Sequence, residues 1–345
     1  MKKIFITLFL AAVALVSCEK YETVKTVDTD FKRNFDAFWT MVDEQYCYLD
    51  YKNINWKGVY DELLPRVEAA QTEQEFFNIL CTALDHLKDG HVWMESHFKA
   101  YSCSTYLYDE NGKRYPSNFD KSVARKYVEE VFHTIDSNLH FGEIKRNGRT
   151  FAYIYQADFE YEWQANDYKY IKPIVEKADG IIFDIRDNPG GSGDIGLQQA
   201  GMFFKEKTHV GYHALKGGPG HNDMTELCPI HATPSKEADW SDKKTMLLTN
   251  REVYSTANLF SSALKLAKNV TQIGGITGGG GAMPMTHFLP NGWIVVFPAN
   301  MLFDVNKQHI ECGIAPDIEV TATDEELAAG RDAIIERAID ELMKS

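Results

Sequence analysis

Ser255 is the residue whose position in this sequence best suits nucleophilic chemistry. It follows a predicted strand at 246–249 and a short turn, and a helix is predicted to begin at Ser255 and run to 268. A serine at the start of a helix is usually an N-cap, and the local sequence alone favours that interpretation. The same position also suits a nucleophile, because the positive end of the helix stabilises developing negative charge.

His91 is the candidate base for that serine. A serine hydroxyl is a poor nucleophile at neutral pH and needs a base beside it, for which histidine is the usual side chain. The chain has 11 histidines, so their number alone selects none of them. His91 is distinguished by its place after Gly90, at the end of a predicted helix and at a predicted domain junction.

Two further segments could complete a site for acyl transfer. Gly190 and Gly191 directly follow a predicted buried strand at 180–185. Paired glycines let the backbone turn sharply and expose amide N–H groups that stabilise an oxyanion, although the same pattern also forms ordinary turns. Glu311 lies near a late turn, where its carboxylate either orients the base or is simply a surface acid.

Helices must position His91, and alternating strands and helices must position the other three segments. Apolar residues recur at helical spacing over 31–46, 59–67 and 72–87, which predicts a small helical N-terminal domain over residues 31–95. Strands and helices alternate from residue 150 on, so residues 96–345 are predicted to form a layered α/β domain. The other predicted elements are helices at 119–135, 164–178, 193–204 and 325–343, strands at 138–143 and 150–155, and a hairpin of 286–289 with 293–297.

Together these segments resemble the C-terminal processing peptidases and their tricorn-like relatives, which share the ClpP/crotonase-type α/β fold. The resemblance covers roughly residues 30–320, in the order of the family. It rests on the following matches: a helical region ending in Asp-Gly-His at 89–91, Asp-x-Arg-x-Asn-x-Gly-Gly at 184–191, a strand-turn-Ser-x-Ala-helix element at 246–260, Gly-Gly-Ile-Thr-Gly-Gly at 274–279, and Glu-x-Gly-Ile-x-Pro-Asp-Ile at 311–318, one residue shorter before the glycine than in the family.

The resemblance implies a serine peptidase of the tricorn-like branch. In the other branch a lysine base follows the threonine, but here four glycines follow Thr277. By resemblance, Ser255 is the nucleophile, His91 the base and Glu311 the acid that holds His91, directly or through another polar group. Backbone N–H groups of Thr256 and of Gly190 or Gly191 would bind the oxyanion. The branch also places a serine before the histidine, where this chain has Gly90.

The first residues predict export and a lipid anchor. Lys2 and Lys3 precede an apolar run at 4–16 that is too short to span a bilayer and suits a signal peptide. A small residue before Cys18 resembles the bacterial lipobox, which predicts a signal peptide at 1–17, acylation of Cys18 and a polar tether at 18–30. A plain secretory signal with an incidental cysteine is the alternative. We expect the protein to lie in the cell envelope, at the outer membrane. The sequence does not specify whether it faces the periplasm or the cell surface.

The charge and the cysteine content of the chain limit the kinds of partner and cofactor that we expect. A net charge of −14, without a basic stripe, argues against nucleic acid. Five cysteines beyond Cys18 are scattered without a CxxC pair, which favours mostly buried free thiols, and no metal or other cofactor is expected.

The expected substrate is a peptide or unfolded protein. No clear PDZ domain is present, and the oligomeric state is not specified by the sequence. The main alternative is a catalytically weak or inactive peptide-binding lipoprotein on the same scaffold.

Overall fold

The computed structural model describes residues 28–109, 111–129, 131–133 and 138–344. The predicted signal peptide, Cys18 and most of the tether therefore lie outside the described residues. No helix within the described ranges is long and apolar enough to cross a membrane.

The predicted N-terminal helices are confirmed, and strands from elsewhere in the chain join them. Thr72 caps its helix with the capping box that the sequence predicts, because its side chain accepts from the Glu75 N–H. The aromatic stripe of these helices packs into one buried core with a small sheet of order β11-β12-β1-β2. These elements are α2 (Phe31–Gln45), α3 (Trp56–Ala69), α4 (Glu73–Asp85), β1 (Trp93–Glu95), β2 (Ala100–Ser102), β11 (Pro284–Phe288) and β12 (Ile294–Pro298).

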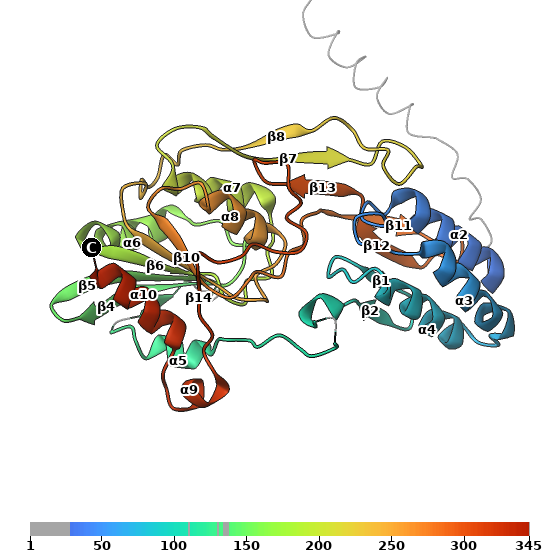
Figure 1. The fold of residues 1–345 in the computed structure, drawn as a ribbon, viewed down its shortest axis with the longest axis horizontal. Helices are drawn as coiled ribbons and strands as arrows, with labels where there is room; N and C mark the ends of the chain where they lie inside the picture. Colours follow the sequence, from blue (N-terminus) through green and yellow to red (C-terminus); the bar gives the residue numbers. More distant parts are fainter. Residues whose placement is uncertain (1–27, 110, 130, 134–137, 345) are drawn as a thin grey trace, which may run out of the picture.

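The β11–β12 pair is the hairpin predicted around Asn291 and Gly292, and it is antiparallel as expected. Its position differs from the predicted division of the chain at residue 95. The hairpin returns from the C-terminal third of the chain and packs against the N-terminal helices, where Trp293 contacts Phe76 and Phe77. The helical region is therefore completed by a late segment, as Figure 1 shows in orange beside the blue helices.

A seven-stranded sheet forms the centre of the remaining chain, with the order β14-β10-β9-β6-β5-β4-β3. The five strands from β14 to β5 are parallel, and β4 and β3 continue the sheet in antiparallel fashion. The loops that follow parallel strands leave the same edge of the sheet, so β6, β9 and β10 bring distant segments together there. The strands are β3 (Val131–His133), β4 (Leu139–Arg146), β5 (Arg149–Gln156), β6 (Gly180–Asp184), β9 (Thr245–Thr249), β10 (Val270–Gly274) and β14 (Ile318–Glu319).

Helices cover both faces of this sheet, which confirms the predicted layered α/β architecture (Figure 1). Alternate residues of β6 enter different cores: Ile181 and Phe183 pack under one helical layer, and Ile182 packs under the other. The first layer contains α6 (Ala165–Lys177), α7 (Gly193–Ala200) and α8 (Thr256–Leu264). The second contains α5 (Lys121–Arg125), α9 (Asp324–Ala328) and α10 (Ala333–Met343).

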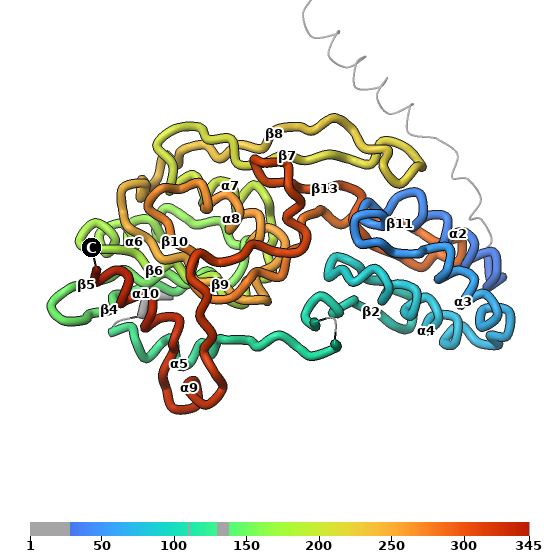
Figure 2. The backbone as a smooth tube through the Cα atoms, viewed as in Figure 1, coloured from blue at the N-terminus to red at the C-terminus, as the bar shows by residue number. Residues whose placement is uncertain are grey.

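A third sheet links the two regions, and the sequence did not predict it. Its order is β13-β7-β8, from β7 (Thr208–Leu215), β8 (Cys228–Ala232) and β13 (Asn300–Phe303). The loop between β7 and β8 reaches the helical region, where His221 contacts Asp43 and Asp50. Figure 2 follows this yellow segment from the α/β layers to the blue helices.

Two predicted helices are wrong in extent. The helix predicted at 119–135 is only the five-residue α5, which Asp120 caps, and β3 follows it. The helix predicted at 325–343 is divided into α9 and α10, because Gly330 adopts a φ of +81° between them. Asp332 then caps α10 by accepting from the N–H groups of Ile334 and Ile335.

Candidate active site

Ser255 has a strained backbone and does not cap its helix. Its φ of 55° and ψ of −123° lie outside the usual regions for a residue with a side chain, and its N–H donates to the Gly279 carbonyl at 2.9 Å. Its side chain makes no hydrogen bond to the start of α8. The cap interpretation that local sequence favours is therefore wrong. The sharp turn between β9 and α8 instead leaves the hydroxyl available to a partner outside the helix, in the manner of a nucleophile elbow.

His91 meets that hydroxyl, although 164 residues separate the two in sequence. Its Nε2 lies 2.9 Å from Ser255 Oγ, and its side chain is largely buried. The ring packs at 4.9 Å on the ring of Tyr254, and the backbone N–H of His91 donates to Asp89 Oδ1 at 2.9 Å. Burial lowers the pKa of His91, while the negative charge of Asp89 opposes that shift. The imidazole is thus favoured in its neutral form, which a base requires.

Of the two predicted glycines, Gly190 lies directly against Ser255. Gly190 has a φ of +107° and Gly191 a φ of +133°, conformations that side chains disfavour. A Cβ at Gly190 would lie 2.7 Å from Ser255 Cβ, so only glycine permits this approach. The Gly190 N–H is occupied, because it donates to Asn188 Oδ1 at 2.9 Å.

The N–H groups of Gly191 and Thr256 donate to no other group within the described ranges. A hydrogen bond of 2.6 Å from Thr256 Oγ1 to the Gly191 carbonyl holds these two residues together. The structure therefore leaves two backbone donors without an acceptor among the described residues, one on the residue after Ser255 and one on the residue after Gly190. Of the three residues expected to form the oxyanion hole, Gly190 allows its backbone to approach Ser255 closely, and Gly191 and Thr256 each have an N–H group without an acceptor in the described residues.

A buried ion cluster fixes the turn that carries these glycines. Arg186 is fully buried and binds Asp184 at 2.6 Å and Asp332 at 2.8 Å. Its guanidinium also lies 4.3 Å from the centre of the Phe119 ring. Because charges this deeply buried are stable only when paired, the cluster holds the end of β6 in one conformation.

Glu311 lies behind His91 but does not hydrogen-bond it. One oxygen of Glu311 accepts from Lys52 Nζ at 2.7 Å, and the other accepts from the Gly281 N–H at 2.8 Å. Lys52 also binds Asp89 at 3.0 Å, so the path from Glu311 to His91 runs through Lys52 and Asp89. Burial raises the pKa of Glu311 to about 7, with Lys52 acting in the opposite direction.

Asp89 is the carboxylate nearest to the base. It is completely buried, and the hydroxyls of Tyr46 and Tyr254 donate to it at 2.8 and 3.3 Å. Burial raises the pKa of Asp89, but Lys52, His91 and the hydrogen bonds from the His91 N–H and the Tyr46 hydroxyl outweigh it and keep the pKa below its ordinary value. Asp89 belongs to the Asp-Gly-His pattern, so the sequence could have identified it. Lys52 lies in a polar turn and carries no such signal.

Comparison with known proteins agrees with this geometry. Residues 150–320 match peptidase family S41, and residues 27–84 match the tricorn protease C1 domain. A protein of Parabacteroides merdae, described as a candidate peptidase, is 35% identical over 91% of this chain and 97% of its own, with a TM-score of 0.83. This chain belongs to peptidase family S41. Peptidases of this family are serine hydrolases, so membership supports a serine peptidase function.

Two structures of lower sequence identity share the fold. Mature CPAF is 10% identical, with a TM-score of 0.67 over 91% of this chain and 97% of that chain. The tricorn protease is 15% identical, with a TM-score of 0.56 over 91% of this chain and 36% of that chain. Among curated proteins, none matches.

Gly90 departs from the tricorn-like pattern, and two tyrosines fill the space that a side chain there would need. A Cβ at Gly90 would lie 2.6 Å from Tyr106 Cε1 and 2.9 Å from Tyr254 Cζ. The Tyr254 hydroxyl accepts from the Gly90 N–H at 3.0 Å. This S41 member therefore has an aromatic pair at the place where the sequence resemblance expects a serine side chain. His91 Nδ1 has no hydrogen-bond partner in the described part of the chain.

The cysteines and the side chains that commonly bind metals form neither a disulfide nor a metal site in the described residues. The five cysteines beyond Cys18 are free, as predicted, but Cys228 and Cys312 are exposed and not buried. Within the described residues, no three His, Cys, Asp or Glu side chains come together in a group that could hold a metal ion.

Proposed function

We propose that this chain is a serine peptidase that cleaves peptides or unstructured polypeptides through an acyl-enzyme formed on Ser255. The observation that carries the proposal is the 2.9 Å contact between Ser255 Oγ and His91 Nε2. It joins a serine with a strained backbone to a buried imidazole whose pKa is lowered by burial, which is the pairing that acyl transfer requires.

The reaction begins when His91 Nε2 takes the proton of Ser255 as Oγ forms a bond to the scissile carbonyl carbon. The carbonyl oxygen becomes an oxyanion, and the N–H groups of Gly191 and Thr256 are the donors that would bind it. His91 then gives its proton to the leaving nitrogen as the C–N bond breaks. A water molecule, deprotonated by His91, attacks the ester and releases the second product with Ser255 restored.

We assign the orientation of His91 to the residues behind it. Asp89 holds the backbone of His91 and lies close enough to stabilise the imidazolium that forms in each half-reaction. Glu311 acts through Lys52, which lies between the two carboxylates, and not by contact with the ring. Tyr254 supports one face of the ring and binds Asp89 as well.

The decisive experiment is labelling with a fluorophosphonate, which reacts with activated serines. We expect labelling of the native chain, none of Ser255→Ala, and undiminished labelling of Ser261→Ala. Ser261 is a suitable control because it lies on the same helix and bonds only the carbonyl of Ala257 at 2.8 Å. Equal labelling of the native chain and Ser255→Ala would refute the assignment of the nucleophile.

A peptide-binding protein without turnover is the second candidate, and the unpartnered His91 Nδ1 favours it. Cleavage of an unstructured polypeptide such as reduced casein separates the two functions. Cleavage that is lost in Ser255→Ala supports the peptidase. Binding of casein by both proteins, without cleavage by either, supports the binding protein.

We also propose that the chain is exported, acylated at Cys18 and held at the cell envelope by that lipid alone, with the outer membrane as the expected site. The support is the sequence pattern at 1–18. Incorporation of labelled palmitate by the native chain, and its loss in Cys18→Ser, is the expected result. Equal incorporation by both chains would contradict acylation at Cys18.

A further inference from the structure

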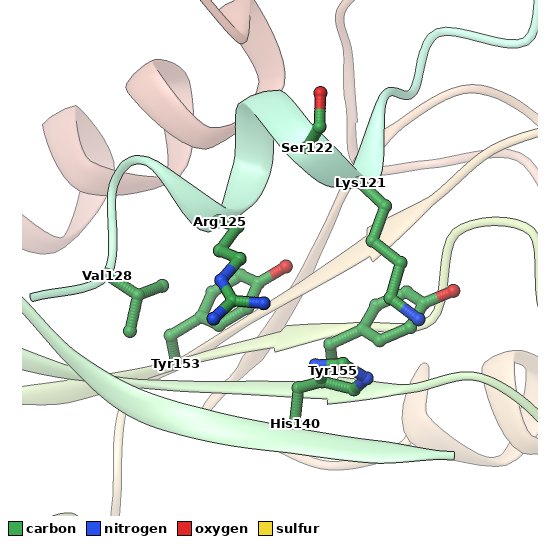
Figure 3. A pocket seen from close by; sticks show the side chains of 7 residues that line it. All are labelled: Lys121, Ser122, Arg125, Val128, His140, Tyr153 and Tyr155. Atoms are coloured by element: carbon green, nitrogen blue, oxygen red, sulfur yellow. The ribbon is translucent and has the colours of Figure 1, made fainter. Parts of the chain in front are cut away.

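A second pocket lies on the face of the central sheet that is opposite α8. It has a volume of about 340 Å³ and lies between α5 and the strands β4 and β5, open to solvent on one side. Lys121 and Arg125 extend from α5 over Tyr155 and Tyr153, as Figure 3 shows, and the hydroxyl of Ser122 points away. None of the residues around Ser255 lines this pocket.

Both cations of the pocket lack a carboxylate partner. Neither Lys121 nor Arg125 makes an ion pair with any described residue, in a chain whose net charge is −14. Lys121 Nζ instead lies 4.8 Å from the centre of the Tyr155 ring, and burial lowers its pKa. Asp120, the nearest acid in sequence, is occupied by the N–H groups of Ser122 and Val123.

The floor of the pocket is apolar and held in place. Tyr153 and Tyr155 are buried, and Val128 closes one side. The Tyr153 hydroxyl donates to Asp184 Oδ2 at 2.9 Å, which turns its polar end away from any ligand and fixes the ring. Phe119 stacks on Tyr155 at 5.6 Å. The pocket therefore offers a preformed aromatic floor and, at its rim, two positive charges that pair with no carboxylate of the described residues.

We propose that this pocket binds a small amphiphilic carboxylate. The apolar body of the ligand packs on the rings of Tyr153 and Tyr155, and its carboxylate lies between Lys121 and Arg125. The volume is at the lower end of small-molecule sites, which fits a single aromatic or short aliphatic acid. Such a group occurs on a free acid and at the end of a short peptide. The proposal does not depend on the peptidase function of Ser255.

Isothermal titration calorimetry with three probes tests it. N-acetylphenylalanine represents a peptide end, 3-phenylpropanoate a free acid, and N-acetylphenylalaninamide the same body without the charge. We expect a dissociation constant of about 1 mM or lower for at least one acid, and binding at least about tenfold weaker for the amide. The acid that binds more tightly identifies the source of the ligand.

Variants locate the binding. Lys121→Met combined with Arg125→Met removes both charges from exposed positions and is expected to weaken binding of the acid at least about tenfold. Lys126→Met is the matched control, because Lys126 follows the same helix and does not line the pocket, and it should bind as the native chain does. Ser255→Ala should also bind normally, which separates this site from the catalytic one. Absence of binding by either acid at 10 mM, or equal binding by the double variant, overturns the proposal.

Discussion

Replacing Lys52 with methionine removes the cation that lies between two buried carboxylates. Lys52 Nζ is 3.0 Å from Asp89 and 2.7 Å from Glu311, and its side chain is only 13% exposed. At an effective dielectric constant of about 20, each contact is worth about 5–6 kcal/mol of Coulomb attraction. Burial of the three charges offsets most of that sum, so the expected net cost of removing one partner is about 3–5 kcal/mol in the free energy of unfolding.

The loss of stability caused by Lys52→Met should depend on pH. Without Lys52, burial and mutual repulsion raise the folded-state pKa values of Asp89 and Glu311 above their unfolded values, so protonation relieves the unpaired charge. The loss of stability in Lys52→Met is then complete at pH values above the folded-state pKa values of the two carboxyl groups. It decreases as the pH falls toward their unfolded-state pKa values. In the native chain the pKa of Glu311 is already about 7. We therefore expect a larger deficit at pH 8 than at pH 5.

Urea unfolding, followed by tryptophan fluorescence at both pH values, measures the deficit through the midpoint and the m-value. Lys57→Met is the matched control, because Lys57 pairs with Asp61 on the exposed side of α3. Its effect should be that of an ordinary surface substitution. If Lys52→Met is no less stable than Lys57→Met at pH 8, or if its deficit is the same at pH 5, the charge argument is refuted.

Two further changes test the surroundings of the base. Asp89→Asn removes the charge that raises the pKa of His91, so the acid limb of the pH profile of kcat/KM should move to lower pH, and its plateau should fall about 10–100-fold. Asp85→Asn is the control. An acid limb that does not move in Asp89→Asn would exclude an electrostatic role for Asp89. Gly90→Ser introduces a Cβ 2.6 Å from Tyr106, so thermal unfolding should show a loss of about 1–3 kcal/mol and peptide cleavage should decrease. Increased cleavage by Gly90→Ser would contradict the view that Tyr254 has taken over the place of the serine hydroxyl.

The sequence predicted best where a local pattern has a local cause. The capping box at Thr72 and the Asn-Gly hairpin at 291–292 both formed as expected, because each depends on residues within a few positions. The helix predicted at 325–343 failed for a related reason. Gly330 ends α9, and Asp332 begins α10 while it also binds Arg186, a partner 146 residues away that no local pattern reveals.

The candidate site shows the same limit. Family resemblance, and not local chemistry, singled out Ser255 and His91, since the segment around Ser255 by itself favours a cap. The strained φ of Ser255 and the free N–H groups of Gly191 and Thr256 depend on the packing of β6 against β9 and could not be seen in the sequence. Lys52 was missed because a lysine in a polar turn is usually exposed, and only the tertiary fold turns it inward.

The arrangement behind His91 has a consequence for its strength as a base. Lys52 balances one of its two carboxylate neighbours, so the charge of the group depends on whether Glu311 is ionised. Because burial places the pKa of Glu311 at about 7, the group gains a negative charge as the pH rises through neutrality. That added charge offsets part of the positive charge of Lys52, which lowers the pKa of His91. Ionisation of Glu311 near neutral pH therefore opposes the effect that Lys52 has on the pKa of His91.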